Sequence, residues 1–162
     1  MDTLGYDPLR LGLMSAYMDL AYIASMGAKG ENSVSIGWYA EAMNPDAKVF
    51  ADKFKAKYGY PADSFAAMGY QIARVIGAAI EQARSADGKA IVAASRKLSY
   101  PKDTGPMVLN YKRIQFDAKG QVPRELTGTV GLQVQSGAYV PIEPKVPGIT
   151  LKFKDAWKSW KK

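Results

Sequence analysis

The sequence predicts an α/β protein in which three or four helices pack beside short strands and a β-ribbon forms the C-terminal third. Three observations support this fold class. Two consecutive capped helices are expected between Asn44 and Arg84, a strand-like alternation covers Ser33–Tyr39, and further alternating segments separated by turn residues follow Pro101. The 162 residues, 48% of them hydrophobic and 23% charged, can form one sizeable core, so a single structural unit is expected.

The first elements are predicted to be short. Leu9–Met14 is an apolar run that predicts a buried strand, and Asp19–Met26 predicts one or two helical turns. In Ser33–Tyr39 the apolar residues occupy every second position, as in a strand with one buried face. We therefore expect Val34, Ile36 and Trp38 to face the core.

The first long helix is predicted from its two ends and its apolar stripe. Asn44 is a favourable N-cap, Pro45 suits the first helical position, and Gly59 suits a left-handed C-cap. The helix should bury one face, because its apolar residues recur at spacings of three or four. These residues are Ala47, Phe50, Phe54 and Tyr58.

A second, longer helix is predicted from Phe65 to about Arg84, with Asp63 or Ser64 as its N-cap. It is apolar around most of its circumference, which predicts burial on more than one side. Three small residues spaced four apart predict a closely packed neighbour along this helix, and they are Gly69, Ala73 and Gly77. A membrane-dimerisation face is the alternative, but Gln71 and Arg74 interrupt the apolar surface that such a face needs.

The chain after Arg84 predicts one more helix and then strands. Asp87 and Gly88 open a third helix at about Lys89–Lys97. Strands and turns are expected at Arg113–Phe116, Asp117–Gly120, Val130–Gln135, Ser136–Gly137 and Ala138–Ile142. A last helix is predicted at Lys154–Trp160.

Composition excludes several classes of chemistry. The sequence contains no cysteine and no histidine, which removes disulfides, thiolate nucleophiles and imidazole metal sites, and no cofactor or metal is expected. No apolar run is long enough for a membrane span. Met1–Leu4 lacks the basic flank and apolar core of a signal peptide, so an exported protein would have its leader removed or placed upstream.

The net charge of +7 comes partly from lysines near the end of the chain, at positions 152, 154, 158, 161 and 162. The same segment carries Phe153, Trp157 and Trp160, a combination that would suit a nucleic-acid binder. An amphipathic end with its aromatic side against the body of the protein explains the pattern equally directly. We favour this second interpretation and expect no nucleic-acid partner.

Several short motifs follow one another in a specific order. They are a capped helix ending in Lys-Tyr-Gly at Phe50–Gly59, Ala-Ala-x-x-Tyr at Ala66–Tyr70, Ala-Ile-Glu-x-Ala at Ala79–Ala83, Gly105–Pro106, Phe-Asp-x-x-Gly at Phe116–Gly120, and Gly-x-Tyr-Val at Gly137–Val140. This series resembles the C-terminal portion of the branched-chain-amino-acid-type (type I) periplasmic solute-binding proteins of ABC importers. The resemblance covers about Ser15–Ile142.

The resemblance implies a partial type I periplasmic-binding-protein fold. Such proteins are exported two-lobed α/β receptors that close on a small solute in the periplasm and deliver it, chemically unchanged, to membrane permease subunits. By this resemblance, residues 1–40 are the end of the second lobe and the crossover, 41–104 the helical part of the first lobe, and 105–162 the terminal β segment and tail. Most of the first lobe's parallel sheet would be absent.

The resemblance also implies three ligand-binding residues. Tyr70 matches a position that can face the cleft, where its hydroxyl could donate to a carboxylate and its ring could cover an apolar group. Ser15 and Tyr17 lie in the turn that aligns with the second lobe's side of the cleft. The aromatic and methionine residues around them favour an amino-acid-like, aromatic or hydrophobic carboxylate over a small polar solute.

Two other functional classes remain open from the sequence. A ligand-sensing domain of a regulatory or chemosensory protein would use the same fold. A hydrolase or transferase would need Ser–Lys or carboxylate chemistry, because a nucleophile paired with histidine or cysteine is excluded. A partial fold leaves helix faces and strand edges uncovered, so we also expect the chain to self-associate.

Overall fold

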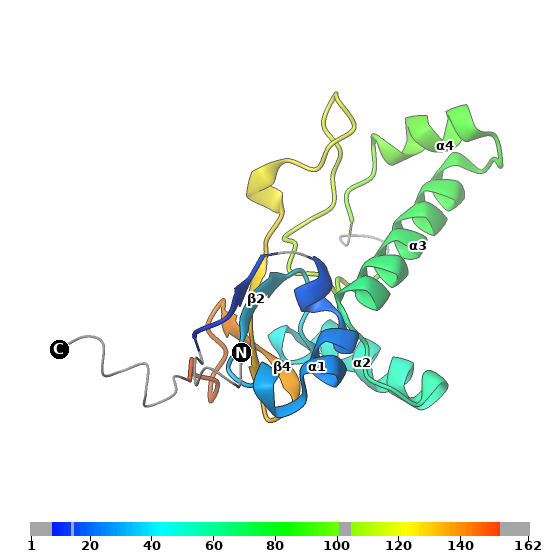
Figure 1. The fold of residues 1–162 in the computed structure, drawn as a ribbon. Helices are drawn as coiled ribbons and strands as arrows, with labels where there is room; N and C mark the ends of the chain where they lie inside the picture. Colours follow the sequence, from blue (N-terminus) through cyan, green and yellow to red (C-terminus); the bar gives the residue numbers. More distant parts are fainter. Residues whose placement is uncertain (1–7, 14, 101–104, 153–162) are drawn as a thin grey trace.

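The computed structural model describes residues 8–13, 15–100 and 105–152, with the side chain of Ser15 excepted. These residues form two adjoining parts (Figure 1). A sheet part contains the four strands and helix α1, and a helical part contains α2, α3, α4 and the loops between residues 105 and 126. The predicted helix at Lys154–Trp160 lies outside the described residues. The architecture is the α/β arrangement that the sequence predicts.

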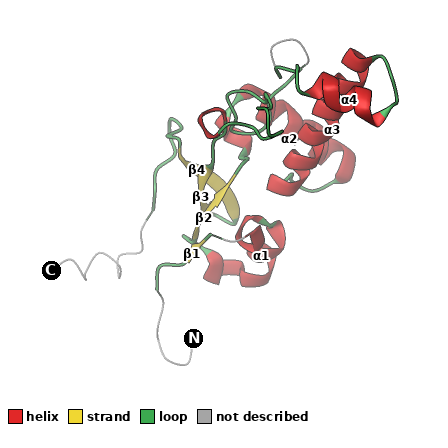
Figure 2. Cartoon of the chain, turned by 90° about the horizontal axis from the view of Figure 1, so that it is seen from above, coloured by secondary structure: helices red, strands yellow, loops and turns green. Residues whose placement is uncertain are grey.

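The sheet has the strand order β1-β2-β3-β4. Its strands are β1 (Leu11–Gly12), β2 (Val34–Gly37), β3 (Val130–Gln135) and β4 (Ala138–Glu143). Strand β1 is parallel to β2, and the other neighbouring pairs are antiparallel. The parallel pair is joined through the 3₁₀ turn η2 (Ser15–Met18), the helix α1 (Leu20–Met26) and the turn η3 (Gly27–Gly30). Figure 2 shows α1 beside the sheet and α2–α4 grouped apart from it.

One face of the sheet, here called the inner face, packs under η2 and α1. Cross-strand register places Gly12, Ser35 and Leu132 on this face. Gly12 lies directly under a tyrosine, since a Cβ added at Gly12 would meet the ring of Tyr17 at 2.0 Å. From β4, the Tyr139 hydroxyl donates to the carbonyl of Tyr17 at 2.6 Å and so ties the far edge of the sheet to η2.

The other face, here called the outer face, is crossed by the last described segment of the chain. Gln133 is fully buried on this face. Its amide nitrogen donates to the carbonyl of Lys152 at 2.7 Å, and its amide oxygen accepts from the N–H of Lys152 at 2.8 Å. Gln135 likewise donates to the carbonyl of Thr150 at 2.8 Å. Two glutamine side chains therefore hold residues 150–152 against the sheet through backbone atoms alone.

The strand predicted within Ser33–Tyr39 is present as β2, and Trp38 beyond its end packs against the helical core. Two other expectations about which residues of the first strands are buried are wrong. Ser35 and Gly37 are buried in β2, whereas Ile36 is exposed, because the helical cover lies over the inner face. The predicted buried strand at Leu9–Met14 is only the two-residue β1, and Met14 lies outside the described residues. The leucines of this segment, Leu9, Leu11 and Leu13, are exposed. Strand β1 pairs with β2 alone, and Leu11 lies on the outer face.

The helices begin and end at the predicted caps. In α2 (Pro45–Tyr58) the Asn44 side chain accepts from the Ala47 N–H, and Gly59 closes the helix in the left-handed conformation at φ 80°. In α3 (Ser64–Ala83) the Asp63 side chain accepts from the Ala66 N–H. Asp87 caps α4 (Gly88–Ser95) in the same way. The helix predicted at Asp19–Met26 is confirmed as α1, with Asp19 as its cap.

The largest core cluster lies in the helical part. Its fully or nearly buried members include Ala47 and Phe50 of α2, Ala67 of α3, and Tyr100 and Val108 of the loops. The predicted stripe on α2 is confirmed at Ala47 and Phe50, but Tyr58, on the last turn, is half exposed. The core is therefore formed where α2, α3 and the segment after residue 105 meet.

The prediction that α3 is buried on more than one side is wrong. Its buried residues, among them Gln71 and Val75, lie on one flank, and Ile72 and Ile76 on the other flank are exposed. A Cβ added at Gly69 or Gly77 would meet nothing within 4 Å, so the small residues face no closely packed neighbour. This flank is open because the other described elements pack on the opposite side of the helix.

The predicted β-ribbon is confirmed only in its second half. Strands β3 and β4 form the expected hairpin around Ser136 and Gly137. Arg113–Phe116 forms no strand; only a single bridge links Ile114 to Tyr100. The turn at Asp117–Gly120 is present, with the Asp117 side chain accepting from the N–H groups of residues 119 and 121. None of the described helices is long and apolar enough to cross a membrane.

Candidate ligand-binding site

A groove of about 480 Å³ lies between α2 and α3 and is the candidate site. Its volume falls within the range typical of small-molecule sites. The lining is mostly apolar. It consists of Asp46, Val49, Phe50, Lys53, Phe54, Lys57 and Tyr58 of α2, Ala66, Gly69 and Tyr70 of α3, and Pro106 and Val108.

The two helices position the aromatic wall of the groove. Phe50 and Phe54 lie one turn apart on α2, with ring centroids 5.7 Å apart. The ring of Tyr70 packs on Phe50 at a centroid distance of 4.9 Å, across the contact between the helices. Tilted ring pairs at these distances are favourable contacts. The groove therefore has a wall that would suit an aromatic ring or a branched aliphatic group.

The third side of the groove is an extended segment fixed by polar contacts. The Val108 N–H donates to the Gln71 side-chain oxygen at 2.9 Å, and Gln71 is buried on α3. The Met107 N–H donates to the Asp46 carboxylate at 3.0 Å. The Tyr100 hydroxyl donates to the Pro106 carbonyl at 2.8 Å. Side chains of both helices thus take the place of a neighbouring strand and hold residues 106–108 beside the groove.

The rim of the groove carries positive charge. Lys53 and Lys57 are exposed, lie four residues apart on α2, and line the groove beside the aromatic wall. The Lys57 ammonium lies 5.3 Å from the centroid of the Tyr58 ring. An apolar wall with two ammonium groups at its edge can bind a carboxylate that carries a hydrophobic group.

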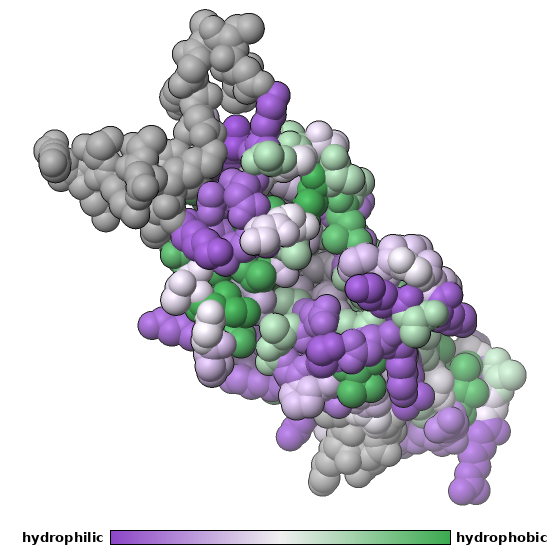
Figure 3. Space-filling model, turned by 90° about the horizontal axis from the view of Figure 1, so that it is seen from below, coloured by the Kyte–Doolittle hydropathy of each residue, from purple (hydrophilic) through white to green (hydrophobic). Residues whose placement is uncertain are grey.

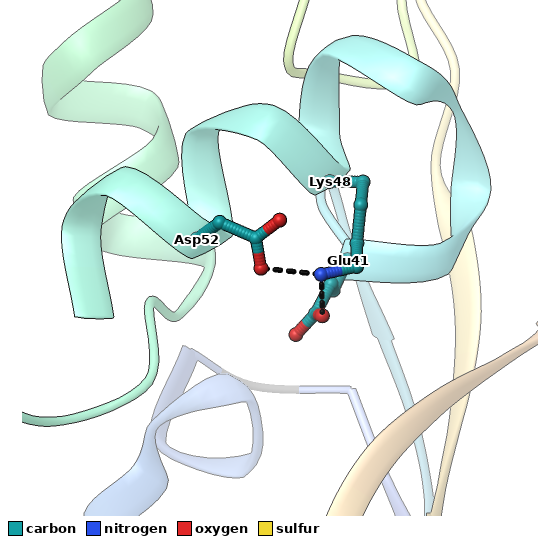
Figure 4. Close-up of polar contacts among 3 residues, drawn as sticks. All are labelled: Glu41, Lys48 and Asp52. Carbon is teal, nitrogen blue, oxygen red and sulfur yellow. Dashed lines mark hydrogen bonds and ion pairs between the residues drawn. The ribbon is translucent and has the colours of Figure 1, made fainter. Parts of the chain in front are cut away.

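A third lysine of α2 is engaged elsewhere. Lys48 forms ion pairs with Asp52 and, at 3.3 Å, with Glu41 of the short turn η4 (Glu41–Met43) (Figure 4). The hydrogen bond to Asp52, followed by that to Glu41, raises the pKa of Lys48. This cluster links η4 to the first turns of α2 and leaves Lys48 outside the groove lining.

Of the predicted site residues, Tyr70 lies in the groove. Its side chain is half-buried between α2 and α3, with one side of the ring against Phe50. It is therefore both a packing residue and part of the groove surface.

The other two predicted residues lie in the sheet part. Tyr17 and Ser15 belong to η2. The Tyr17 ring packs on Gly12 and on Tyr22, with 4.8 Å between the two tyrosine ring centroids. Tyr17 and Tyr70 thus belong to separate aromatic clusters, so the structure does not bring the predicted residues together in one site.

The two parts meet near the N-terminus of α3. A Cβ added at Gly37, at the end of β2, would lie 2.9 Å from the Ser64 hydroxyl and 3.4 Å from the Met18 sulfur. Close by in sequence, the Tyr39 hydroxyl is buried without a hydrogen-bond partner among the described residues. Burial raises the pKa of Tyr39, and the nearby carboxylates, first Glu41, raise it further. Tyr39 therefore remains an uncharged phenol at this junction.

Sequence reasoning missed the lysines of the groove and the role of Gln71. Lys53 and Lys57 lie beside the predicted apolar stripe of α2, and their i,i+4 spacing next to Phe50 and Phe54 was the available signal. Gln71 was considered only as an interruption of an apolar face. No group of three acidic residues in the described ranges is arranged to hold a metal ion.

The comparisons with known proteins assign the family. A family model described as "Periplasmic binding protein" matches residues 1–126, which is most of the chain. The chain belongs to the periplasmic binding protein family. No curated protein matches it at a significant level.

Solved structures of this family share the fold. A leucine binding protein, LivK, from Thermotoga maritima is 26% identical, with a TM-score of 0.66 over 86% of this chain and 38% of its own. The substrate binding protein LivJ from Streptococcus pneumoniae, in complex with isoleucine, is 18% identical, with a TM-score of 0.67 over 85% and 37%. A solute binding protein from R. palustris in complex with benzoate is 18% identical, with a TM-score of 0.56 over 74% and 31%.

These relatives are much longer than this chain, which spans less than two fifths of the length of each of the three. The shared part is a type I periplasmic-binding-protein fold, as the order of motifs predicts. The relatives are solute-binding proteins rather than enzymes.

Proposed function

We propose that this chain is part of the substrate-binding component of an ABC importer, which binds its solute without changing it chemically. The observation that carries the proposal is the family match over residues 1–126, together with the structural likeness to amino-acid and benzoate receptors. On this proposal the protein works in the periplasm, after removal of a leader, and its partners are the permease subunits of the importer. It needs no cofactor and no nucleic acid.

The proposed solute is a small amino-acid-like, aromatic or hydrophobic carboxylate. Relatives described with leucine, isoleucine or benzoate support this class, since all three compounds join a carboxylate to an apolar group. The α2–α3 groove has the matching chemistry, with Tyr70 and Phe50 on its wall and Lys53 and Lys57 at its rim. We propose that Tyr70 contacts the solute there, and that Tyr17 and Ser15 supply a second-lobe side of the cleft in the intact receptor.

On this proposal the chain has three segments. Residues 1–40 would be the end of the second lobe and the crossover, 41–104 the helical part of the first lobe, and 105–162 the terminal β segment and tail.

The regulatory or chemosensory alternative is not favoured, because relatives are described as transporter proteins. We further propose that the isolated chain self-associates, since several large apolar side chains of α3 are exposed.

A ligand screen tests the proposed function. We expect leucine, isoleucine or benzoate to raise the melting temperature of the 162-residue chain, and maltose to have no effect. The Lys53→Gln and Lys57→Gln changes should each weaken binding about tenfold, because each removes an ammonium from the rim of the groove. Lys55→Gln is the matched control, as this exposed lysine of the same helix does not line the groove.

Two outcomes would contradict the proposal. A thermal response to sugars or metal ions alone would exclude the carboxylate class. Equal loss of binding in the Lys53→Gln, Lys57→Gln and Lys55→Gln variants would show that the solute does not bind in the α2–α3 groove.

A further inference from the structure

Within the described residues, the chain passes between the sheet part and the helical part twice. The first connection (residues 38–40) follows the last residue of β2, and the second connection (residues 127–129) precedes the first residue of β3. Those two strand residues, Gly37 and Val130, are partners in the antiparallel register, so both connections leave the sheet side by side. Figure 3 shows the described residues as one continuous surface, whereas Figure 2 shows α2–α4 set apart from the strands. The orientation of the two parts therefore depends on how these connections are held.

The first connection is fixed by burial. Its consecutive residues Tyr39 and Ala40 are 4% and 3% exposed, and they belong to different cores. Tyr39 packs in the core cluster of the helical part, whereas Ala40 packs with Val130 and Leu132 of β3. A rotation of one part against the other would pull one of these side chains out of its core. Packing therefore holds this connection from both sides.

The second connection is held by polar contacts instead. None of residues 127–129, all of which the structure describes, belongs to either core cluster. The Asn110 side-chain nitrogen donates to the Thr129 carbonyl at 2.7 Å. The backbone N–H of the same asparagine donates to the Trp38 carbonyl, in the first connection, at 2.9 Å. Asn110 thus bonds to both connections.

Asn110 is itself fixed in the helical part. It follows the segment 106–108, which side chains of α2 and α3 hold beside the groove. Two residues further on, the Lys112 N–H donates to the Leu126 carbonyl at 2.9 Å, just before the second connection begins. Gly128 lies directly against Asn110, since a Cβ added at Gly128 would come within 2.3 Å of the Asn110 carbonyl oxygen. Any side chain at position 128 would therefore push the second connection away from Asn110.

We propose that Asn110 is a positioning residue that restrains the orientation of the sheet part relative to the helical part. Its amide group pins the connection that burial does not hold, and Gly128 permits the close approach. Loss of the amide would free the second connection and leave both core clusters intact, because Asn110 belongs to neither. The consequence for solute binding rests on the proposed function, since a solute that contacts both Tyr70 and Tyr17 needs the two parts in one orientation.

Spin-label distance measurements on the full chain test the proposal. The chain contains no cysteine, so labels can be placed at Ala24→Cys on α1 and Gln82→Cys on α3, two exposed positions with one in each part. The labelled chain is diluted with unlabelled chain, so that the distances recorded lie within one copy. We expect a narrow distance distribution, which Asn110→Ala should broaden or shift. An unchanged distribution would overturn the proposal.

A label pair within one part is the matched control. Ala56→Cys on α2 and Gln82→Cys on α3 both lie in the helical part, so Asn110→Ala should leave the distance between them unchanged. Equal broadening of both label pairs would show that the variant loosens the helical part itself, and it would overturn the proposal. Gln121→Ala, an exposed residue of the loops between 105 and 126, should change neither pair.

Two further variants separate the hydrogen bond from the shape of the side chain. Asn110→Asp keeps the shape but loses the donor, so it should broaden the distribution between the two parts as Asn110→Ala does. Gly128→Ala should shift the same distribution, whereas Gly77→Ala on α3, where an added Cβ meets nothing within 4 Å, should not. A narrow distribution in Asn110→Asp, or an equal response in both glycine variants, would contradict the role of Asn110.

The restraint and the solute can fail separately, because the distance measurement needs no solute. Broadening in Asn110→Ala without any thermal response of the unaltered chain to leucine, isoleucine or benzoate would support the restraint and count against the solute. A thermal response with unchanged distances in Asn110→Ala would support the solute and overturn the restraint.

Discussion

Strand β3 and helix α3 are the central elements of the sheet part and the helical part, and they are covered to different extents. In β3 both faces are buried, with Leu132 on the inner face and Gln133 on the outer face almost inaccessible to solvent. In α3 the buried residues lie on one flank, while Ile72 and Ile76 on the other are about half exposed.

The difference follows from how each element satisfies its backbone. A helix forms its hydrogen bonds internally, so an uncovered flank loses only the free energy of apolar burial. A strand needs neighbours for its backbone, and β3 pairs with β2 and β4 on its two sides. Its own Gln133 and Gln135 also hold residues 150–152 over the outer face. The helical part can therefore retain its core although one flank of α3 has no cover among the described residues.

The largest expected effect is the loss of the aromatic centre of the helical part. Phe50→Ala should lower the free energy of unfolding by about 3–5 kcal/mol, because Phe50 is buried and packs on the rings of Tyr39, Phe54 and Tyr70. Urea denaturation followed by circular dichroism measures the change. Val92→Ala on α4, where the side chain is 55% exposed, is the control and should have little effect. Similar losses in both variants would mean that the helical part has no packed centre at Phe50.

A smaller loss is expected when the contact between α3 and the extended segment is removed. Gln71→Leu should lower the free energy of unfolding by about 2 kcal/mol, since the buried Val108 N–H would lose its acceptor. Gln82→Leu, an exposed position on the same helix, is the control. Hydrogen exchange at Val108 gives the direct measurement, and unchanged protection there would contradict the assigned hydrogen bond.

The smallest effects compare two tyrosines, one in each environment. Tyr139→Phe should lower the free energy of unfolding by about 1 kcal/mol, because the hydroxyl joins β4 to the carbonyl of Tyr17. Tyr39→Phe should leave stability unchanged or raise it by about 1 kcal/mol, because that hydroxyl is buried without a partner among the described residues. The two variants should thus shift the urea midpoint in opposite directions or by clearly different amounts. A larger loss in Tyr39→Phe than in Tyr139→Phe would show that the buried hydroxyl is in fact satisfied.

The elements that could be predicted from the sequence are those that local chemistry defines. Asn44, Pro45 and Gly59 specify the two ends of α2 by side-chain capping, a fixed φ and a left-handed closure. The hairpin β3–β4 follows from alternation on both sides of Ser136–Gly137. These signals act within a few residues, so they require no knowledge of the rest of the chain.

The features that could not be predicted depend on distant segments. Alternation in β2 identified two faces, but the position of η2 and α1 decides that Ser35 rather than Ile36 is buried. The apolar circumference of α3 predicted burial on more than one side, yet the described chain covers one flank only. In the same way, Tyr70 could be selected from its motif, whereas the partners that form the groove around it, Lys53 and the segment at Val108, come together only in the fold.

The attachment of residues 150–152 to the outer face has a consequence for how the protein tolerates change. Gln133 and Gln135 recognise main-chain atoms, so substitutions at Thr150 or Lys152 should be accepted as long as the backbone can reach them. Proteolytic cleavage just before Thr150 would be more damaging than any such substitution. It would remove one backbone partner from each of two amide side chains at once and open the outer face of the sheet to water and to other polypeptides.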